Sequence, residues 1–405
     1  MEVAIIGGGA AGMMAALTAA EWTDSSVVLL ERQSRLGRKL LATGNGRCNL
    51  SNLHCAPQHY HGRSPDFVRP ALDAFGPEDT LAYFRRLGLL CRAEDSGRVY
   101  PLSDQANSVL DTLRLALEGF GVTVRTDCQV SAIAPQSSGF LLTTSAGTLF
   151  ADKVIVTAGG AASPKLGGTR DGYQLLRSLG HRCTKLYPSL VQLRTDTTYT
   201  RALKGVRAEA AVTLKNGQAV IARQRGEVQF TDYGVSGPVI FELSRAAVTE
   251  EGPLTLSLDL VESLSQGELV ELLAEKQQLL PGLTLENLLT GVLHNRLGRT
   301  VLRYSGRKLT QSVSELSRRD LAHIARSCKA FQLEVTGNQG LEHAQVTAGG
   351  LRTDQFYPET LESRCCPGLY AAGEVLDVDG DCGGFNLQWA WSSGRLAGFL
   401  GHNDD

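Results

Sequence analysis

The sequence has 405 residues, of which 42% are hydrophobic and 20% charged, with a formal net charge of −2. This composition is typical of a soluble globular protein of two or three domains, and it gives no overall case for binding nucleic acid or membranes. Nine cysteines without a C-x-x-C pair predict free thiols in a reducing cytoplasm and no structural zinc or other metal site. The first strand begins almost at Met1, which predicts no signal peptide. No apolar run reaches the roughly twenty residues that span a bilayer.

The N-terminal segment has the pattern of a dinucleotide-binding unit. An apolar strand (3–6) leads into the glycine turn Gly7–Gly12 and a helix (13–21), and a second strand (26–30) ends on Glu31. The alternative is a glycine-rich turn that packs a helix and binds nothing. Because strand, helix and acidic residue all occur at the required spacing, we favour nucleotide binding.

Each glycine of this turn has a separate expected role. Gly7 permits the tight turn, Gly9 lets a pyrophosphate approach the backbone, and Gly12 lets the helix pack on the strand. The helix N-terminus, with Ala10 and Ala11, offers free N–H groups and a partial positive charge to the phosphates. Glu31 stands where a carboxylate can accept both ribose hydroxyls of an adenosine.

The next motif reads G-R-K-L-L-A-T-G-N-G-R-C-N-L-S-N over residues 37–52. Glycine and asparagine recur too densely in its second half for a regular helix or strand, so we expect a loop. A plain surface loop is the alternative. The motif resembles the signature of a bacterial flavoprotein family called BaiN/RdsA-like or YhiN-like, whose members are NAD(P)/FAD-dependent oxidoreductases. The resemblance implies that this loop lies against FAD near the isoalloxazine ring, and that the cofactor contacts include Arg32, Lys39, Gly46 and Asn49.

Residues 64–187 continue the first domain. Amphipathic helices are predicted in 64–120, strands at 122–124 and 129–133, and a hairpin at 140–150. A buried strand then ends in Thr157, Ala158 and Gly159, and this resembles the strand end at which the chain of two-dinucleotide flavoproteins crosses under the cofactor. Val130 is expected at the same cofactor. The helix predicted at 172–179 is not followed by a second ribose-binding acid, so NAD(P)H would only visit the flavin as a transient reductant.

From about residue 188 the pattern changes to short alternating strands and then to helices, before core-type strands return near residue 346. The economical topology is an α/β Rossmann-type FAD-binding domain interrupted by an inserted substrate domain with a small β-barrel part and a helical part. The expected boundaries are 1–187 and 346–405 for the FAD-binding domain, 188–345 for the insertion, 188–260 plus 330–345 for its β-rich part and 261–329 for its helical part. Its predicted strands are 190–193, 208–214, 219–223, 227–230 and 254–258, and its predicted helices are 267–278, 285–291, 299–304 and 313–327.

Two features of the insertion suggest contact with substrate. Residues 226–238 resemble a second signature of the family. Pro238 suits the first turn of a helix and Ser236 its cap. This is either a plain capped helix start or a site whose free N–H groups point at the substrate or the flavin. Between residues 294 and 329 there are nine lysines and arginines and only two acidic residues. Such a run is usually a solvated face, and the alternative is a site for a polyanion such as ribosomal RNA. The candidate substrate contacts are Ser236, Arg296, Arg299 and Arg303.

The C-terminal segment resembles the third flavoprotein element. A strand ends at Gly373 and Glu374, and the resemblance implies that this acid holds the ribityl or pyrophosphate part of FAD. A helix then opens at residues 383–394, with its N-terminus beside the flavin pyrimidine. Its expected cofactor contacts are Gly384, Phe385, Asn386 and Leu387. Cys382 departs from the small hydroxyl residue expected at its position.

The resemblance covers nearly the whole chain and implies reduction of a carbon–carbon double bond by hydride from reduced flavin. Uridine in ribosomal RNA, converted to dihydrouridine, is the leading substrate. The alternatives are an NAD(P)H-dependent reductase of a small-molecule enone such as a steroid or bile-acid intermediate, a flavin redox sensor without turnover, and a hydroxylating monooxygenase. The oligomeric state is left open.

Two residues of the 37–52 loop are candidates for catalysis. Cys48 would deliver the proton, because a thiol with an ordinary pKa of about 8.5 can do so near neutral pH. The alternative is an inert buried thiol. Arg47 would hold a substrate carbonyl or phosphate.

Overall fold

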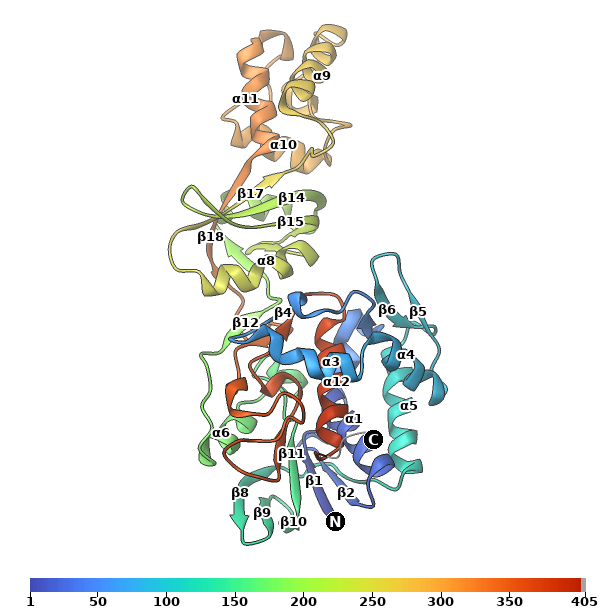
Figure 1. Cartoon of the computed structure of the whole chain (residues 1–405). Helices are drawn as coiled ribbons and strands as arrows, with labels where there is room; N and C mark the ends of the chain where they lie inside the picture. Colours follow the sequence, from blue (N-terminus) through green and yellow to red (C-terminus); the bar gives the residue numbers. More distant parts are fainter. Residues whose placement is uncertain (402–405) are drawn as a thin grey trace. The chain divides into compact units, whose positions relative to one another are not determined.

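The computed structural model describes residues 1–401 and divides the chain into two compact units (Figure 1). The first unit comprises residues 1–188 and the segment that follows residue 343, and the second unit comprises residues 189–343. The second unit therefore interrupts the first in sequence. Among the described residues, no helix is both long enough and apolar enough to cross a membrane.

The centre of the first unit is a five-stranded parallel sheet. In spatial order its strands are β20 (Leu369–Ala371), β11 (Lys153–Val156), β1 (Glu2–Ile6), β2 (Ser26–Leu30) and β7 (Thr123–Arg125). The strands are nearly all apolar, as expected for a sheet covered on both faces. Because parallel strands end at the same edge, Ala372, Thr157, Gly7 and Glu31 follow four neighbouring strands along one edge.

Helices α1 (Ala10–Trp22) and α12 (Phe385–Gly398) lie beside each other next to this sheet (Figure 1). A Cβ atom on Gly394 would overlap the Ala11 carbonyl oxygen, and one on Gly398 would lie 2.7 Å from the Ala15 carbonyl oxygen. The two helices therefore approach so closely that only glycine fits. This contact brings the C-terminal part of the chain against its first helix.

Smaller elements surround the sheet and these helices. The helices are α2 (Arg38–Ala42), α3 (Arg69–Ala74), α4 (Pro77–Arg86), α5 (Ala106–Gly119) and α6 (Asp171–Ser178). The strands are β3 (Ser51–Asn52), β4 (Tyr60–His61), β5 (Cys91–Ala93), β6 (Arg98–Pro101), β8 (Val130–Gln136), β9 (Gly139–Thr144), β10 (Gly147–Ala151), β12 (Tyr187–Ser189), β19 (Val346–Ala348) and β21 (Asp379–Gly380). The antiparallel pair β5–β6 lies inside residues 64–120, where only helices were predicted.

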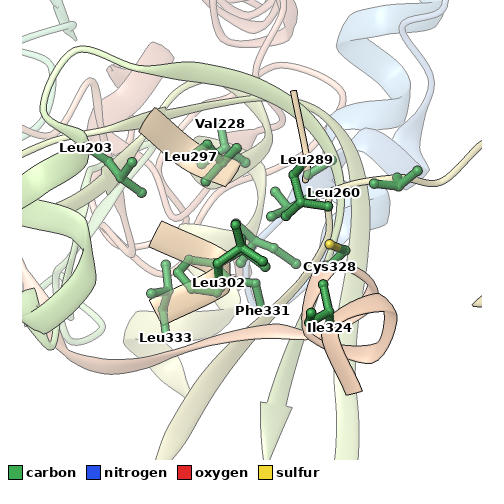
Figure 2. Packing of buried hydrophobic residues seen from close by; sticks show 14 of the residues in the cluster. Leu203, Val228, Leu260, Leu289, Leu297, Leu302, Ile324, Cys328, Phe331 and Leu333 are labelled. Carbon is green, nitrogen blue, oxygen red and sulfur yellow. The ribbon is translucent and has the colours of Figure 1, made fainter. Parts of the chain in front are cut away.

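The second unit contains a closed barrel of six strands. In order around the barrel these are β13 (Leu193–Thr195), β16 (Gly234–Ser236), β15 (Ala219–Phe230), β14 (Arg207–Asn216), β17 (Leu254–Asp259) and β18 (Phe331–Asn338). Its helices are α7 (Thr197–Thr200), α8 (Pro238–Thr249), α9 (Gln266–Leu279), α10 (Asn295–Tyr304) and α11 (Arg318–Lys329). Barrel strands and helices share one apolar core, to which Val228, Leu297, Ile324 and Phe331 contribute (Figure 2).

Three predictions for the insertion were wrong in detail. Strand β15 runs unbroken from Ala219 to Phe230, although two strands were predicted, because Gly226 continues the ladder opposite Ala210. Residues 285–291 form only a short 3-10 turn at Leu285–Asn287. Residues 313–327 divide into a 3-10 turn and α11, because Ser317 caps a new helix by accepting from the Asp320 N–H.

The predicted cap of α8 was also wrong. Pro238 does begin the helix, but the capping position is Gly237, and Ser236 is the buried last residue of β16. Gly237 has φ 106°, and a Cβ atom there would lie 2.5 Å from the Glu227 carbonyl oxygen. The sharp turn from β16 into α8 therefore requires glycine at the position before the proline.

A buried polar network holds α12 in place. The Gln388 amide nitrogen lies 2.8 Å from Thr80 Oγ1, 2.9 Å from Ser392 Oγ and 3.1 Å from the Phe75 carbonyl oxygen, and its amide oxygen accepts from Ser51 Oγ at 2.6 Å. Gln388 itself is fully buried. One side chain therefore ties α12 to β3, to α4 and to the end of α3.

Replacing this side chain should destabilise the first unit. Gln388→Leu leaves the Ser51 hydroxyl buried without its acceptor, and we expect a loss of about 2 kcal/mol in the free energy of unfolding. Gln278→Leu, at an exposed position of α9, is the matched control and should change stability by less than about 0.5 kcal/mol. Chemical denaturation followed by circular dichroism measures both. Equal midpoints for the two variants would contradict the role of the network.

Candidate functional site

A cleft lies at the sheet edge where β1, β2 and β11 end. Its empty volume is about 810 Å³, including space open to solvent. The lining residues are 6–9, 30–33, 35, 37–39, 128–130, 157–160, 166–169, 171 and 175. We call it the sheet-edge cleft. It occupies the position at which open α/β sheets bind nucleotides, beyond the carboxyl ends of the strands.

The sheet-edge cleft brings together nine of the predicted cofactor residues. These are Gly7, Gly9, Glu31, Arg32, Lys39, Val130, Thr157, Ala158 and Gly159. A Cβ atom on Gly9 or Gly159 would meet nothing within 4 Å, whereas one on Gly7 or Gly12 would overlap neighbouring backbone. Gly7 and Gly12 are therefore required by the packing of the chain itself. Gly9 and Gly159 instead leave space that a ligand can fill.

The Glu31 carboxylate is fixed at this cleft by backbone donors. Its Oε2 accepts from the Gly8 N–H and its Oε1 from the Gln33 N–H, both at 2.7 Å. A carboxylate oxygen has a second lone pair, so both oxygens can still accept hydroxyl hydrogen bonds. The arrangement fits the predicted contact with an adenosine ribose.

Charged side chains of the sheet-edge cleft pair with segments that are distant in sequence. Lys39 forms an ion pair with Glu374 at 2.6 Å, and the other oxygen of Glu374 accepts from the Thr347 N–H at 2.9 Å. Arg32 lies 3.7 Å from Asp171 and donates to the Gly167 carbonyl at 3.2 Å. The turn at residues 166–169 was not predicted as part of the site, although its glycine pair was a visible signal.

A second group of predicted residues surrounds the start of α12. Asn52 Nδ2 donates to the Gly383 carbonyl at 2.8 Å, and a Cβ atom on Gly384 would lie 2.9 Å from Asn49 Oδ1. That Asn49 oxygen is buried and has no hydrogen-bond partner among the described residues. No described side chain caps α12, whose first turn therefore presents backbone N–H groups. An unused buried acceptor beside a helix N-terminus fits the donor and acceptor edge of a flavin pyrimidine.

The loop that approaches α12 has an unusual backbone. Gly44, Asn45, Gly46 and Cys48 all have positive φ, between 57° and 86°. A Cβ atom on Gly46 would meet nothing within 4 Å. Gly46 lines a second cavity, of about 680 Å³, together with Arg35, Leu41 and residues 105–107. Gly46 therefore lies outside the sheet-edge cleft, unlike the nine predicted cofactor residues that line it.

The structure does not support the predicted role of Arg47 in holding substrate. Its guanidinium is 3.2 Å from Glu94, donates from Nε to Asp104 at 3.2 Å and lies 4.0 Å from the centre of the Tyr100 ring. Two carboxylates and an aromatic face therefore already occupy this cation. Arg47 anchors the loop to the strands β5 and β6 and the turn that follows them.

The structure also does not support Cys48 as the proton donor. Its side chain is fully buried, and burial raises the pKa of the thiol to about 12. An inaccessible thiol with so high a pKa is a poor acid near neutral pH. Cys48 instead packs beneath the loop in a left-handed conformation with φ 61°.

Several of the residues predicted to contact the cofactor at the start of α12 already use their polar groups in hydrogen bonds within the protein. The Asn386 amide accepts from the Gly380 N–H and donates to the Gly380 carbonyl, both at 2.8 Å, so this side chain holds the preceding turn. Phe385 is buried and Leu387 is half-buried. Gly373 uses its N–H and carbonyl on Ser393 and Trp389. Any cofactor contact of Asn386 would therefore involve its backbone.

One polar cluster beside α12 was not predicted from the sequence. Asp381 accepts from His59 Nδ1 at 2.9 Å and from His61 Nε2 at 2.7 Å. Burial by itself raises the pKa of Asp381, but the hydrogen bonds from the two imidazoles outweigh burial and hold that pKa below its usual value. Because more than three hundred residues separate the acid from the histidines, no local pattern could reveal the cluster.

The candidate substrate residues of the second unit differ in availability. Ser236 is 8% exposed. Arg296 donates to the carbonyls of Ala202 and Lys204, and Arg299 lies 3.4 Å from Glu286. Arg303 is exposed and makes no ion pair among the described residues. Arg303 alone of the four is both exposed and free of an ion pair or side-chain hydrogen bond in the described structure.

The space at Gly9 generates a direct test of cofactor binding. Gly9 has φ −82° and ψ −170°, which alanine also adopts, so Gly9→Ala should fold normally. If a pyrophosphate approaches this backbone, the added methyl group should weaken FAD retention about tenfold or more. Flavin absorbance per protein after gel filtration measures retention. Gly119→Ala, at another open glycine, is the control, and full FAD retention in Gly9→Ala would contradict the assignment.

Three known proteins resemble this chain along most of its length. The 3-dehydro-bile acid delta(4,6)-reductase of Clostridium scindens is 39% identical over 401 residues, which are 98% of this chain and of that protein. The ribosomal RNA dihydrouridine synthase of Escherichia coli is 30% identical over 395 residues, 97% of this chain and 96% of that protein. The structure of 3-ketosteroid delta1-dehydrogenase from Sterolibacterium denitrificans, in complex with 1,4-androstadiene-3,17-dione, shares the fold, with a TM-score of 0.50, 14% identity and 98% coverage of both chains.

These findings confirm the predicted fold class and the family resemblance. The first unit is a Rossmann-type FAD-binding domain, and the chain is an FAD-dependent oxidoreductase. The family model described as the HI0933-like protein Rossmann domain matches residues 1–400, and the chain belongs to this family.

Proposed function

We propose that this oxidoreductase reduces a carbon–carbon double bond conjugated to a carbonyl group, with uridine of ribosomal RNA as the leading substrate. The names of two relatives support this chemistry. One is a ribosomal RNA dihydrouridine synthase and the other a bile acid delta(4,6)-reductase. Both reactions add two hydrogens across a C=C bond. The structural observation that carries the proposal is the sheet-edge cleft together with the start of α12. No described side chain caps this helix, and the adjacent Asn49 oxygen has no hydrogen-bond partner among the described residues.

In this proposal the first unit holds FAD, and each group of residues has a share in that task. Gly9 and Gly159 leave room for the pyrophosphate, and Glu31 accepts the ribose hydroxyls. The start of α12 stabilises negative charge on the reduced ring. Bound FAD supplies a hydride once reduced, and NAD(P)H is the proposed electron donor. Since the sequence has one dinucleotide fingerprint, the donor would bind only transiently.

An exposed basic stripe supports RNA as the substrate. On α11, Arg319, His323 and Arg326 are exposed at positions i, i+4 and i+7, which share one helix face. Arg303 and Lys308 are also exposed. None of these four lysines and arginines forms an ion pair within the described residues. Cations of this kind bind phosphates and make the affinity dependent on salt.

Other basic residues of the helical part are already neutralised. Arg299, Arg307, Arg318 and Lys329 pair with Glu286, Asp320, Glu271 and Asp259, respectively. The positive excess seen in the sequence between residues 294 and 329 is therefore smaller on the surface. This reduction, together with the 39% identity to the bile acid reductase, favours a small-molecule enone as the second candidate substrate.

A single-turnover experiment distinguishes the two candidates. The protein is reduced anaerobically with NADPH or dithionite and then mixed with an unmodified large-subunit rRNA transcript or with a 4,6-dien-3-one steroid. We expect the transcript to reoxidise the flavin and to gain dihydrouridine, as detected by mass spectrometry. Reoxidation by the steroid alone would establish the second candidate, and reoxidation by neither would contradict double-bond reduction.

The basic stripe can be tested in the same assay. Arg319→Ser combined with Arg326→Ser should slow reoxidation by the transcript about tenfold at low salt, because two phosphate contacts are lost. Arg114→Ser combined with Arg223→Ser removes two exposed charges elsewhere and is the control. Equal rates for the two double variants would contradict RNA binding at the stripe.

Because Cys48 is buried, we expect its replacement to have little effect on the reaction rate. Cys48→Ala should retain FAD. Its reduced flavin should be reoxidised, by the probe that the wild type reduces, within about threefold of the wild-type rate. A larger loss is expected only for a true proton donor, because general acid catalysis contributes at least about a hundredfold where it operates. Stopped-flow absorbance of the flavin measures this rate. A hundredfold loss with normal FAD content would restore Cys48 as the proton donor.

A further inference from the structure

The cluster of His59, His61 and Asp381 is built by strand pairing in the first unit. His59 precedes β4 and His61 ends it, while Asp381 directly follows β21. The two strands pair antiparallel, and the Asp381 N–H donates to the His59 carbonyl at 3.0 Å. This pairing places Asp381 beside both His59 and His61, so both imidazoles reach the same carboxylate.

The shared carboxylate leaves one nitrogen of each ring unused. Asp381 accepts from His59 Nδ1 and from His61 Nε2. His59 Nε2 and His61 Nδ1 have no hydrogen-bond partner among the described residues, and the two side chains are 31% and 34% exposed. Asp381 therefore fixes the orientation of each ring through one nitrogen, and the other nitrogen is left without a hydrogen-bond partner in the described structure. Imidazole gives and takes protons near neutral pH.

The cluster lies at the start of α12, where the flavin ring is proposed to bind. The His59 ring stacks on Phe385, the first residue of α12, with 4.5 Å between ring centres. The Asn386 side chain donates to the Asp381 carbonyl at 3.2 Å. The turn that carries Asp381 is thus held by α12, the helix whose N-terminus faces the proposed flavin ring.

The other titratable groups around His59 are poor proton donors. Tyr60 donates to the Phe385 carbonyl, and burial raises its pKa well above the usual value. Cys55 lies 3.6 Å from the Tyr60 hydroxyl, and burial raises its pKa to about 11. Among these groups the imidazoles alone combine exposure with an open nitrogen.

We propose that His59 is the catalytic acid of the double-bond reduction, with Asp381 and His61 as positioning residues. This inference rests on the proposed function. The hydride forms a C–H bond at the carbon β to the carbonyl, and the π electron pair becomes an enolate. That pair then takes the proton from His59 Nε2 and forms the second C–H bond at the α carbon. Bound and reduced FAD would supply this hydride, which carries the two electrons of the reduction, while His59 becomes neutral and regains its proton from water.

Asp381 supports this step through its hydrogen bond to His59 Nδ1. The bond fixes the orientation of the ring and directs Nε2 away from the carboxylate. His61 donates to the second oxygen of the Asp381 carboxylate and keeps this carboxylate from rotating.

The test separates proton donation from electron transfer. His59→Asn, Asp381→Asn and the exposed control His54→Asn are loaded with FAD and reduced anaerobically. Reoxidation of the flavin is followed with two acceptors. Ferricyanide accepts electrons without any protonation of a carbon atom. The carbon substrate is the rRNA transcript or the dienone steroid, whichever the wild type reduces. We expect His59→Asn to lose about a hundredfold with the carbon substrate and nothing with ferricyanide. Perturbation of the oxidised flavin spectrum should show unchanged binding of the substrate.

A rescue experiment guards against a merely structural effect. His59→Gly should also lose activity with the carbon substrate, and added imidazole should restore at least part of it, whereas Asp381→Asn should be impaired without rescue. Wild-type rates in His59→Asn, or an equal loss with ferricyanide, would overturn the assignment. If the wild type itself reduces neither probe, the proposed function fails and this inference fails with it.

Discussion

The site depends on the close approach of α1 and α12. Gly394 lies directly against the Ala11 carbonyl and Gly398 against Ala15. Any side chain at either glycine would separate the helix that follows the nucleotide turn from the helix that faces the proposed flavin ring. Since α12 begins about 380 residues after the turn, this packing brings the two ends of the cofactor site into one unit.

The glycines of the site fall into two physical classes. Gly7, Gly12 and Gly394 are required by the packing of the chain, because a Cβ atom there would overlap backbone atoms. Gly9 and Gly159 face open space. Only the second class reports on a ligand, and the distinction cannot be read from a G-x-G-x-x-G pattern, in which all glycines look alike.

Polar contacts beneath and beside α12 connect stability to chemistry. Gln388 fixes the helix from the buried side, and Asn386 fixes the turn that carries Asp381. The same helix therefore positions backbone N–H groups for the proposed flavin and a carboxylate for two imidazoles. In the second unit, ion pairs neutralise part of the basic segment and leave the stripe through Arg319 and Arg326 exposed.

The sequence by itself determined the nucleotide turn, Glu31 and most strands and helices, because these depend on local periodicity and on residues close along the chain. The family followed from the resemblance of several sequence motifs to a known signature. Only the tertiary structure decided which side chains are free. It showed Arg47 held by Glu94 and Asp104, and Cys48 buried. It also joined His59 to Asp381 across 322 residues. Burial, ion pairing and long-range contact arise from packing, and a linear pattern carries no record of them.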